Sequence, residues 1–254
     1  MKIVLSFVKT ATALLMLLVS ISAEAAEIRI IGSPGLSAAF EVLGPQFERA
    51  TGHTLAMQYG LIVVQKQQIE AGAFDLAIVP SLVLDDAIKQ GKITADTRTP
   101  VARVSVGVGV RANTAMPDLT STDAFKRALL NAKSVSYVTD EPTGRHIAKE
   151  FERLGIADAM KAKTKSQETT ARVWQAVASG EVELGFGFTS NALSVRGVEL
   201  AGLFPPELQY SAVLTAGVSV AARQADGAKA LIKYLLAPEA AAMMKAKGLE
   251  PAAP

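Results

Sequence analysis

The pattern of apolar and polar residues predicts a chain in which strands and helices alternate. Residues 27–31 have the pattern of a strand, which ends at the Gly- and Pro-containing turn 32–35. Apolar residues at helical spacing follow, and residues 55–59 again alternate like a strand. Residues 75–79 form a nearly continuous apolar run, which is typical of a strand buried on both faces of a parallel sheet. This succession of elements predicts an α/β fold.

A second unit with the same alternation of strands and helices follows the first. Residues 134–138 and 182–188 have strand patterns, with helical patterns between them. Two stretches rich in β-branched residues, 101–110 and 212–220, flank this unit. A chain that leaves one domain, builds a second and returns needs two such crossings. The predicted lobes are residues 26–104 with 219–254 for the first and residues 105–218 for the second.

The N-terminal residues 1–25 have the pattern of a signal peptide. Lys2 and Lys9 provide a basic start, the apolar run 11–21 follows, and Ala23-Glu24-Ala25 matches a small-residue cleavage site. The alternative is a membrane anchor, but the apolar run is shorter than the ~20 residues that a spanning helix needs. We therefore expect the segment to be removed on export and the mature protein to reside in the periplasm.

Composition excludes several kinds of function. The 26 basic and 24 acidic residues nearly balance, so we expect no nucleic-acid partner. The chain contains no Cys, which rules out thiolate chemistry, Cys-ligated zinc and iron–sulfur clusters. Two histidines are too few for the usual His-rich metal sites, and no phosphate loop, calcium loop or zinc motif occurs. We expect neither a metal nor a cofactor.

Candidate binding residues follow the predicted strands. In α/β sheets ligands bind beyond the carboxyl ends of strands, where the following helices present free backbone N–H groups. The turns at 32–37, 60–62, 140–146 and 167–172 lie at such positions. Their hydroxyl groups could instead cap helices, and their arginines could be ordinary solvated side chains.

Two arginines make an anionic ligand the better interpretation. Arg145 and Arg172 each fall near the start of a predicted helix, where the helix dipole disfavours a cation. Two such residues facing one cleft need a compensating anion, and Arg recognises carboxylate or phosphate with two parallel hydrogen bonds. His146 has two interpretations, as a packed histidine or as a proton-transfer group.

Several segments carry a resemblance that covers essentially the whole mature chain. They are residues 69–72 (IEAG), 74–78 (FDLAI), 154–158 (LGIAD), 178–185 (ASGEVELG), 236–241 (LAPEAA) and 247–251 (KGLEP). With these segments the sequence resembles the molybdate-binding-protein-like branch of the bacterial extracellular solute-binding proteins.

The resemblance implies a two-lobed type II periplasmic binding protein fold, joined by two crossing strands. It also implies a monomer that closes around a small anion, with hinges within residues 104–110 and 214–220, and that delivers it to the membrane permease of an ABC importer. The predicted ligand-binding residues are Ser33, Gly35, Ser37, Gly60, Leu61, Thr143, Gly144, Arg145, His146, Thr170, Arg172, Phe188 and Thr189.

Departures from the family pattern bear on the ligand. The turn from Ser33 to Ser37 is similar to that of molybdate binders, which hold an oxyanion with hydroxyls and backbone amides. Leu61 stands in a turn that is Ser-rich in the family, and Phe188 stands where the family has a tyrosine. These apolar residues suit a carbon skeleton, so we expect an organic mono-, di- or tricarboxylate rather than molybdate.

Two other functions stay open. Some proteins that resemble this branch are periplasmic, cofactor-free isomerases of unsaturated tricarboxylates such as aconitate. Such an isomerase needs carboxylate clamps and one group that moves a proton, and Arg145, Arg172 and His146 could supply them. A sensor lobe that presents its ligand to a membrane receptor would differ from a transport protein only in its partner.

Overall fold

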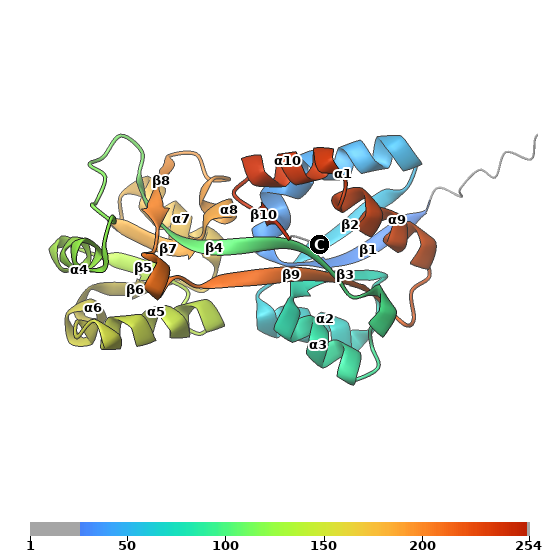
Figure 1. Ribbon diagram of the computed structural model, residues 1–254, viewed down its shortest axis with the longest axis horizontal. Helices are drawn as coiled ribbons and strands as arrows, with labels where there is room; N and C mark the ends of the chain where they lie inside the picture. Colours follow the sequence, from blue (N-terminus) through green and yellow to red (C-terminus); the bar gives the residue numbers. More distant parts are fainter. Residues whose placement is uncertain (1–25, 253–254) are drawn as a thin grey trace, which may run out of the picture.

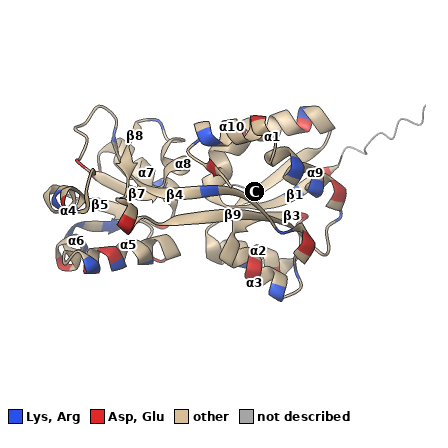
Figure 2. Cartoon of the chain, in the orientation of Figure 1, with Lys and Arg blue, Asp and Glu red and all other residues tan. Residues whose placement is uncertain are grey.

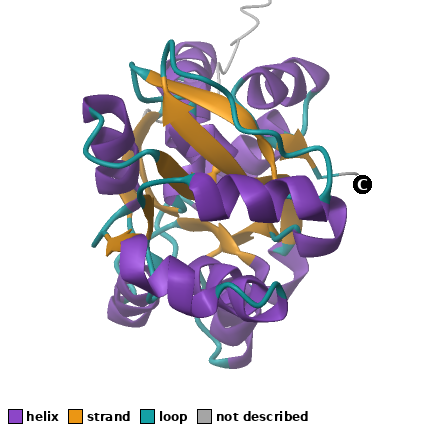
Figure 3. Cartoon of the chain, turned by 90° about the vertical axis from the view of Figure 1, so that its left-hand side faces the viewer, coloured by secondary structure: helices purple, strands orange, loops and turns teal. Residues whose placement is uncertain are grey.

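Two lobes lie end to end and share the long strand β4 (Figure 1). The computed structural model describes residues 26–252, so the predicted signal peptide lies outside the described residues. Helices lie around the strands, as the view along the long axis shows (Figure 3). This arrangement confirms the predicted α/β fold of two lobes joined by crossing strands.

The first lobe contains the elements nearest both ends of the described chain. They are β1 (Glu27–Gly32), η1 (Pro34–Leu36), α1 (Ser37–Thr51), β2 (Thr54–Tyr59), α2 (Ile62–Ala71), β3 (Leu76–Pro80), α3 (Ser81–Lys89), η2 (Ala95–Thr97), the start of β4 (Thr99–Arg111), β9 (Ser211–Val218), α9 (Ala225–Leu235), α10 (Pro238–Ala246) and β10 (Glu250–Pro251). The strand order is β2-β1-β3-β9-β4, with β1, β2 and β3 parallel and β9 antiparallel to its neighbours.

The second lobe is built from the middle of the chain. Its elements are the end of β4, α4 (Thr122–Asn131), β5 (Val135–Tyr137), α5 (Pro142–Arg153), α6 (Ala157–Lys163), β6 (Thr164–Ser166), α7 (Thr170–Ser179), β7 (Leu184–Phe188), α8 (Thr189–Ala192), β8 (Val198–Leu203) and η3 (Pro206–Leu208). β4 pairs with β7 and β8, and the order continues through β5 to β6.

The crossing strands change lobes close to each other. β4 pairs with β9 up to Ser105 and with β7 from Val106 onward. β9 pairs with β4 over residues 211–216 and with β3 over residues 214–218, so its whole length belongs to the sheet of the first lobe. We therefore place the second crossing near Ser211, ahead of the boundary at 218–219 expected from the sequence. An apolar, β-branched stretch has the same pattern in a crossing as in a central strand, which explains the difference.

Each lobe has its own core. Buried side chains such as Ile28, Leu76 and Leu231 form the core of the first lobe, and Phe125, Phe151 and Phe186 belong to that of the second. The half-buried rings of Phe188 and Tyr210 pack against both cores.

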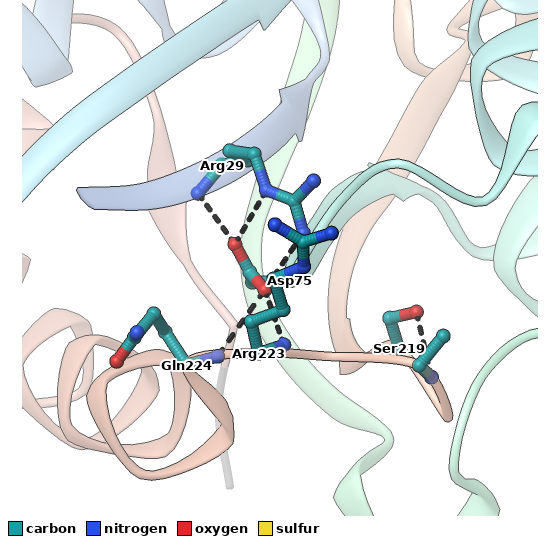
Figure 4. A network of polar contacts seen from close by, with 6 residues as sticks. Arg29, Asp75, Ser219, Arg223 and Gln224 are labelled. Atoms are coloured by element: carbon teal, nitrogen blue, oxygen red, sulfur yellow. Dashed lines mark hydrogen bonds and ion pairs between the residues drawn. The ribbon is translucent and has the colours of Figure 1, made fainter. Parts of the chain in front are cut away.

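A buried carboxylate ties the start of the first lobe to its end (Figure 4). Asp75 is fully buried and accepts hydrogen bonds from the backbone N–H, Nε and Nη2 of Arg29 at 2.9, 3.0 and 3.2 Å. Its Oδ1 also accepts the backbone N–H groups of Arg223 and Gln224 at 2.7 and 3.2 Å, the two residues directly before α9. The predicted strand 75–79 thus begins with a polar residue whose bonds hold distant segments together.

Charge is spread over the molecule. Lys and Arg residues are interspersed with Asp and Glu residues on the helices of both lobes (Figure 2). Among residues 26–252, no helix is both long enough and apolar enough to cross a membrane.

Candidate functional site

A cleft lies between the lobes, at the carboxyl ends of strands from both of them. It has a volume of about 680 Å³, part of which is open to solvent. The first lobe contributes the turns after β1, β2 and β3, and the second contributes those after β5, β6 and β7. The cleft is therefore where the general rule for α/β sheets places a ligand.

Two helices from opposite lobes begin at this cleft without a side-chain cap. Leu61 precedes α2 and cannot cap it, and Glu141 precedes α5 without bonding to its first turn. The N–H groups of an uncapped first turn lack partners within the helix and, together with the helix dipole, attract an anion. By contrast, α7 is capped by Thr169, whose Oγ1 accepts the N–H of Arg172 at 3.3 Å.

The structure brings seven of the thirteen predicted residues together in the wall of the cleft. They are Ser33, Gly35, Gly60, Leu61, Thr143, Thr170 and Phe188. Those from the first lobe lie on the turns after β1 and β2, and those from the second lie at the starts of α5 and α7 and at the end of β7.

The two predicted arginine clamps lie outside this wall. Both side chains are exposed, and each has a partner of its own. Arg145 Nη1 donates to the carbonyl oxygen of Asp140 at 2.6 Å, and Arg172 Nη1 donates to Gln175 Oε1 at 3.4 Å. An Arg side chain can place its guanidinium group on different sides of one backbone position. The spacing of residues in the sequence therefore could not show which way Arg145 and Arg172 point.

His146 is turned toward the second crossing. Its Nε2 lies 2.9 Å from the carbonyl oxygen of Leu208, and because a carbonyl only accepts, Nε2 carries the proton. The imidazole also packs against Tyr210, with 5.2 Å between ring centroids. This side chain supports the wall through Tyr210 and does not line the cleft itself.

The last three predicted residues have local structural contacts. Ser37 Oγ donates to the carbonyl of Pro34 at 3.0 Å, and Thr189 Oγ1 donates to that of Gly248 at 2.9 Å. Gly144 lies in the first turn of α5, where a Cβ atom would come within 2.1 Å of the Val138 carbonyl oxygen. Glycine is therefore needed there so that α5 can approach the loop after β5.

An aromatic pair forms one side of the cleft. The rings of Phe188 and Tyr210 are stacked, with centroids 6.4 Å apart and planes inclined by 22°. Both residues line the cleft at the level of the crossing strands. Burial raises the pKa of the Tyr210 hydroxyl, so this group is a hydrogen-bond donor at neutral pH.

Among the described residues that line the cleft, Glu141 is the charged one. Burial raises the pKa of its carboxyl group, although the backbone N–H of Ile62 and the charge of Arg145 act in the opposite direction. The Ile62 N–H belongs to the first turn of α2 in the other lobe. The carboxyl group thus faces a position where helix geometry favours an anion.

Sequence reasoning did not select several residues of the wall. Glu141, Gln65, Tyr137, Asn191 and Tyr210 all line the cleft. Glu141 stands directly before Pro142 in a turn that the sequence identified, and Gln65 follows Leu61 by one helical turn. Nothing in the sequence pattern distinguishes the two tyrosines. Within the described part of the chain, no three His, Asp or Glu side chains gather in a way that could hold a metal ion.

Curated relatives span nearly the full chain. An aconitate isomerase from a Pseudomonas species is 26% identical over 231 residues, which cover 88% of this chain and 87% of the relative. The molybdate-binding protein ModA of Azotobacter vinelandii is 27% identical over 242 residues, covering 91% and 92%.

Solved structures and the family assignment agree with the fold. The periplasmic molybdate-binding protein of Azotobacter vinelandii superimposes with a TM-score of 0.75 at 18% identity, covering 89% of this chain and 99% of that one. Residues 28–250 match the family described as bacterial extracellular solute-binding protein. With its two lobes, crossing strands and a cleft of uncapped helix starts, the chain belongs to the bacterial extracellular solute-binding protein family.

Proposed function

We propose that this protein binds a small organic anion in the cleft between its lobes and delivers it to the permease of an ABC importer in the periplasmic space. The observation that carries the proposal is the meeting of the uncapped starts of α2 and α5 in one cleft. N–H groups in the first turns of α2 and α5 favour an anion that touches both lobes, although the Glu141 carboxyl group already lies at the Ile62 N–H. Such a ligand would stabilise the closed arrangement.

The wall of the cleft favours an organic ligand over a bare oxyanion. Leu61, Ile62 and Phe188 present apolar surface, while Ser33, Thr143 and Thr170 present hydroxyl groups. Apolar walls with a few convergent polar groups are typical of sites for carbon-containing ligands. The similarity to ModA proteins supports anion binding in general, and the apolar wall supports a carboxylate.

A substitution at the start of α2 tests the anion site directly. Ile62 is the first residue of the helix, where proline is tolerated, and Leu61 already has the extended backbone that precedes a proline (ψ 167°). Ile62→Pro removes one N–H donor, so we expect roughly 10- to 100-fold weaker binding, because a hydrogen bond to a charged group contributes about 1.5–3 kcal/mol. Ile62→Val keeps the N–H and is the matched control.

The measurement is the melting temperature of the mature protein with molybdate, tungstate, sulfate, phosphate and mono-, di- and tricarboxylates. A ligand at 100 times its Kd adds about 2.7 kcal/mol of stability. Stabilisation by a carboxylate that is lost in Ile62→Pro and kept in Ile62→Val supports the proposal. Stabilisation by molybdate alone would assign the site to a bare oxyanion.

A second candidate is a cofactor-free isomerase of an unsaturated tricarboxylate such as aconitate. The specific observation in its favour is Glu141, a carboxyl group that lines the cleft, where a general base must lie, and whose pKa is raised by burial. The similarity to an aconitate isomerase supports the same candidate. Glu141 would take the place that sequence reasoning gave to His146, removing a proton from one end of the allylic unit and returning it to the other.

Proton NMR separates the two candidates. A binding protein leaves cis- or trans-aconitate unchanged, whereas an isomerase converts each into the same mixture. In D₂O an isomerase would also introduce deuterium at the carbon that receives the proton. Loss of conversion in Glu141→Gln, with binding kept, would assign the proton transfer to this residue.

A further inference from the structure

A buried amide acceptor in the cleft has no donor. Gln65 lies on α2, one turn after Leu61, and only 1% of the residue is exposed. It lines the cleft, and its Nε2 donates to the carbonyl oxygen of Gly60 at 2.8 Å. Its Oε1 is buried and has no hydrogen-bond partner among residues 26–252.

The orientation of this amide follows from its partner. The Gly60 carbonyl only accepts hydrogen bonds, so the amide nitrogen must face it and the amide oxygen must face the other way. Because Gly60 lies two residues before α2, the amide lies close to the N-terminal end of that helix. A buried acceptor without a donor is costly, and native structures rarely keep one unless a ligand or water completes it.

The surrounding side chains leave this requirement to the ligand. The described residues that line the cleft include no Lys or Arg, and none of the hydroxyl groups in the wall bonds to this oxygen. Glu141, the charged residue among those that line the cleft, is an acceptor when ionised. The first turn of α2 supplies donors suited to an anion, and Gln65 supplies an acceptor next to them. A ligand that satisfies both carries an anionic group and a hydrogen-bond donor close together.

We propose that the ligand is a hydroxylated carboxylate whose hydroxyl group donates to Gln65 Oε1 while its carboxylate binds the start of α2. This inference rests on the proposed binding of an organic anion in the cleft and specifies its class. Ionised molybdate, and carboxylates without a hydroxyl group, leave the Gln65 oxygen unpaired. A site built to bond a ligand hydroxyl discriminates strongly against the analogue that lacks it, because its own polar group is then left buried and unpaired.

Matched ligand pairs test the proposal. Citrate and tricarballylate differ by one hydroxyl group, as do malate and succinate, and calorimetric titration gives the Kd of each. We expect the wild-type protein to bind the hydroxylated member at least about tenfold more tightly, the factor that corresponds to one unsatisfied buried acceptor. This comparison needs no variant, so it does not depend on how a substitution affects folding.

A variant pair assigns the preference to one residue. Gln65→Met removes the amide and keeps the length of the side chain, and we expect it to reduce the preference to less than about threefold. Gln68→Met on the same helix is the control, because the Gln68 Oε1 is also buried without a partner among the described residues but lies outside the wall of the cleft. It should keep the full preference.

The outcomes are distinct. Equal affinities within each pair, or a preference that survives in Gln65→Met, would overturn the inference while leaving carboxylate binding in place. If molybdate binds and no carboxylate does, the proposed function fails and this inference fails with it.

Discussion

Ser105 Oγ lies 2.9 Å from Ser211 Oγ, and this hydroxyl pair joins the two crossing strands where β4 changes lobes. Beyond Ser105 the partner of β4 is no longer β9 but β7 of the second lobe. The backbone N–H of Val106 still donates to the carbonyl of Tyr210 at 3.0 Å, so the strands separate over two residues. We propose this point as the hinge between the lobes.

Closure about this hinge can be measured by labelling. The chain has no native Cys, so Gln67→Cys on α2 and Lys149→Cys on α5 would carry the two labels without background. Both positions are exposed and lie on opposite lobes. We expect the ligand to shorten and narrow the distribution of distances between the labels, measured by electron paramagnetic resonance. An unchanged distribution at saturating ligand would argue against a hinge at Ser105 and Ser211.

Removing the charge of Asp75 should strongly destabilise the first lobe. Asp75→Asn keeps the size of the side chain but breaks an ion pair in which the carboxylate is completely buried. We expect the free energy of unfolding to fall by at least about 3 kcal/mol in chemical denaturation. Asp85→Asn breaks the exposed pair with Arg98 and should cost no more than about 1 kcal/mol. Similar losses in the two variants would contradict this assignment.

The same carboxylate predicts how stability depends on pH. Burial raises the pKa of Asp75, but the hydrogen bonds from Arg29, Arg223 and Gln224 outweigh it and hold the pKa below its ordinary value. A depressed pKa in the folded state means that the contribution is complete above the unfolded pKa, about 3.9, and is lost as the pH falls through the folded pKa. We expect the acid-induced loss of stability to be smaller in Asp75→Asn than in the wild type, measured by denaturation between pH 6 and pH 2.

Glu141 should oppose anion binding when it is ionised. Its pKa is raised, so the carboxyl group is neutral at low pH and becomes charged as the pH rises through that higher value. We expect Glu141→Gln to bind a carboxylate roughly tenfold more tightly than the wild type above this pKa, and equally below it. Titrations of both proteins with one ligand cancel the ionisation of the ligand itself. Asp140→Asn, at an exposed position outside the cleft, should show no such difference.

The two arginines near the helix starts should matter little for affinity. Arg145 and Arg172 bond to Asp140 and Gln175, away from the wall of the cleft. We expect Arg145→Ala and Arg172→Ala to change the Kd no more than about twofold, whereas Thr143→Val should weaken binding roughly three- to tenfold through loss of a hydroxyl bond. A tenfold loss in either arginine variant would mean that its side chain moves into the cleft when the ligand binds.

The order and type of the elements could be predicted because they depend on local patterns. Residues 75–79 are apolar almost throughout, and the structure buries β3 completely. The same reasoning located the turns after β1, β2 and β5, since a strand that ends in Gly, Ser, Pro or Thr and leads into a helical pattern is visible in the sequence.

The direction of side chains could not be predicted in the same way. Seven predicted residues line the cleft, and these lie mainly on strand-to-helix turns, where backbone position alone decides exposure to the ligand. Arg145, Arg172 and His146 have long or rotatable side chains. Contacts with neighbouring groups set where the two arginines point, and a contact with the distant Leu208 carbonyl sets the direction of His146. Such contacts have no signal in the spacing of residues.

The sequence by itself determined the α/β succession, the two-unit organisation and the turns that surround the cleft, because hydrophobic periodicity and turn residues act over a few neighbouring positions. Only the tertiary structure decided that Glu141 faces the start of α2, that Gln65 keeps an unpaired oxygen in the cleft, and that β9 belongs to the first lobe. Glu141 meets α2, and β9 meets β3, only after segments far apart in the chain have packed together. The bond of Gln65 to Gly60 forms only once α2 has folded.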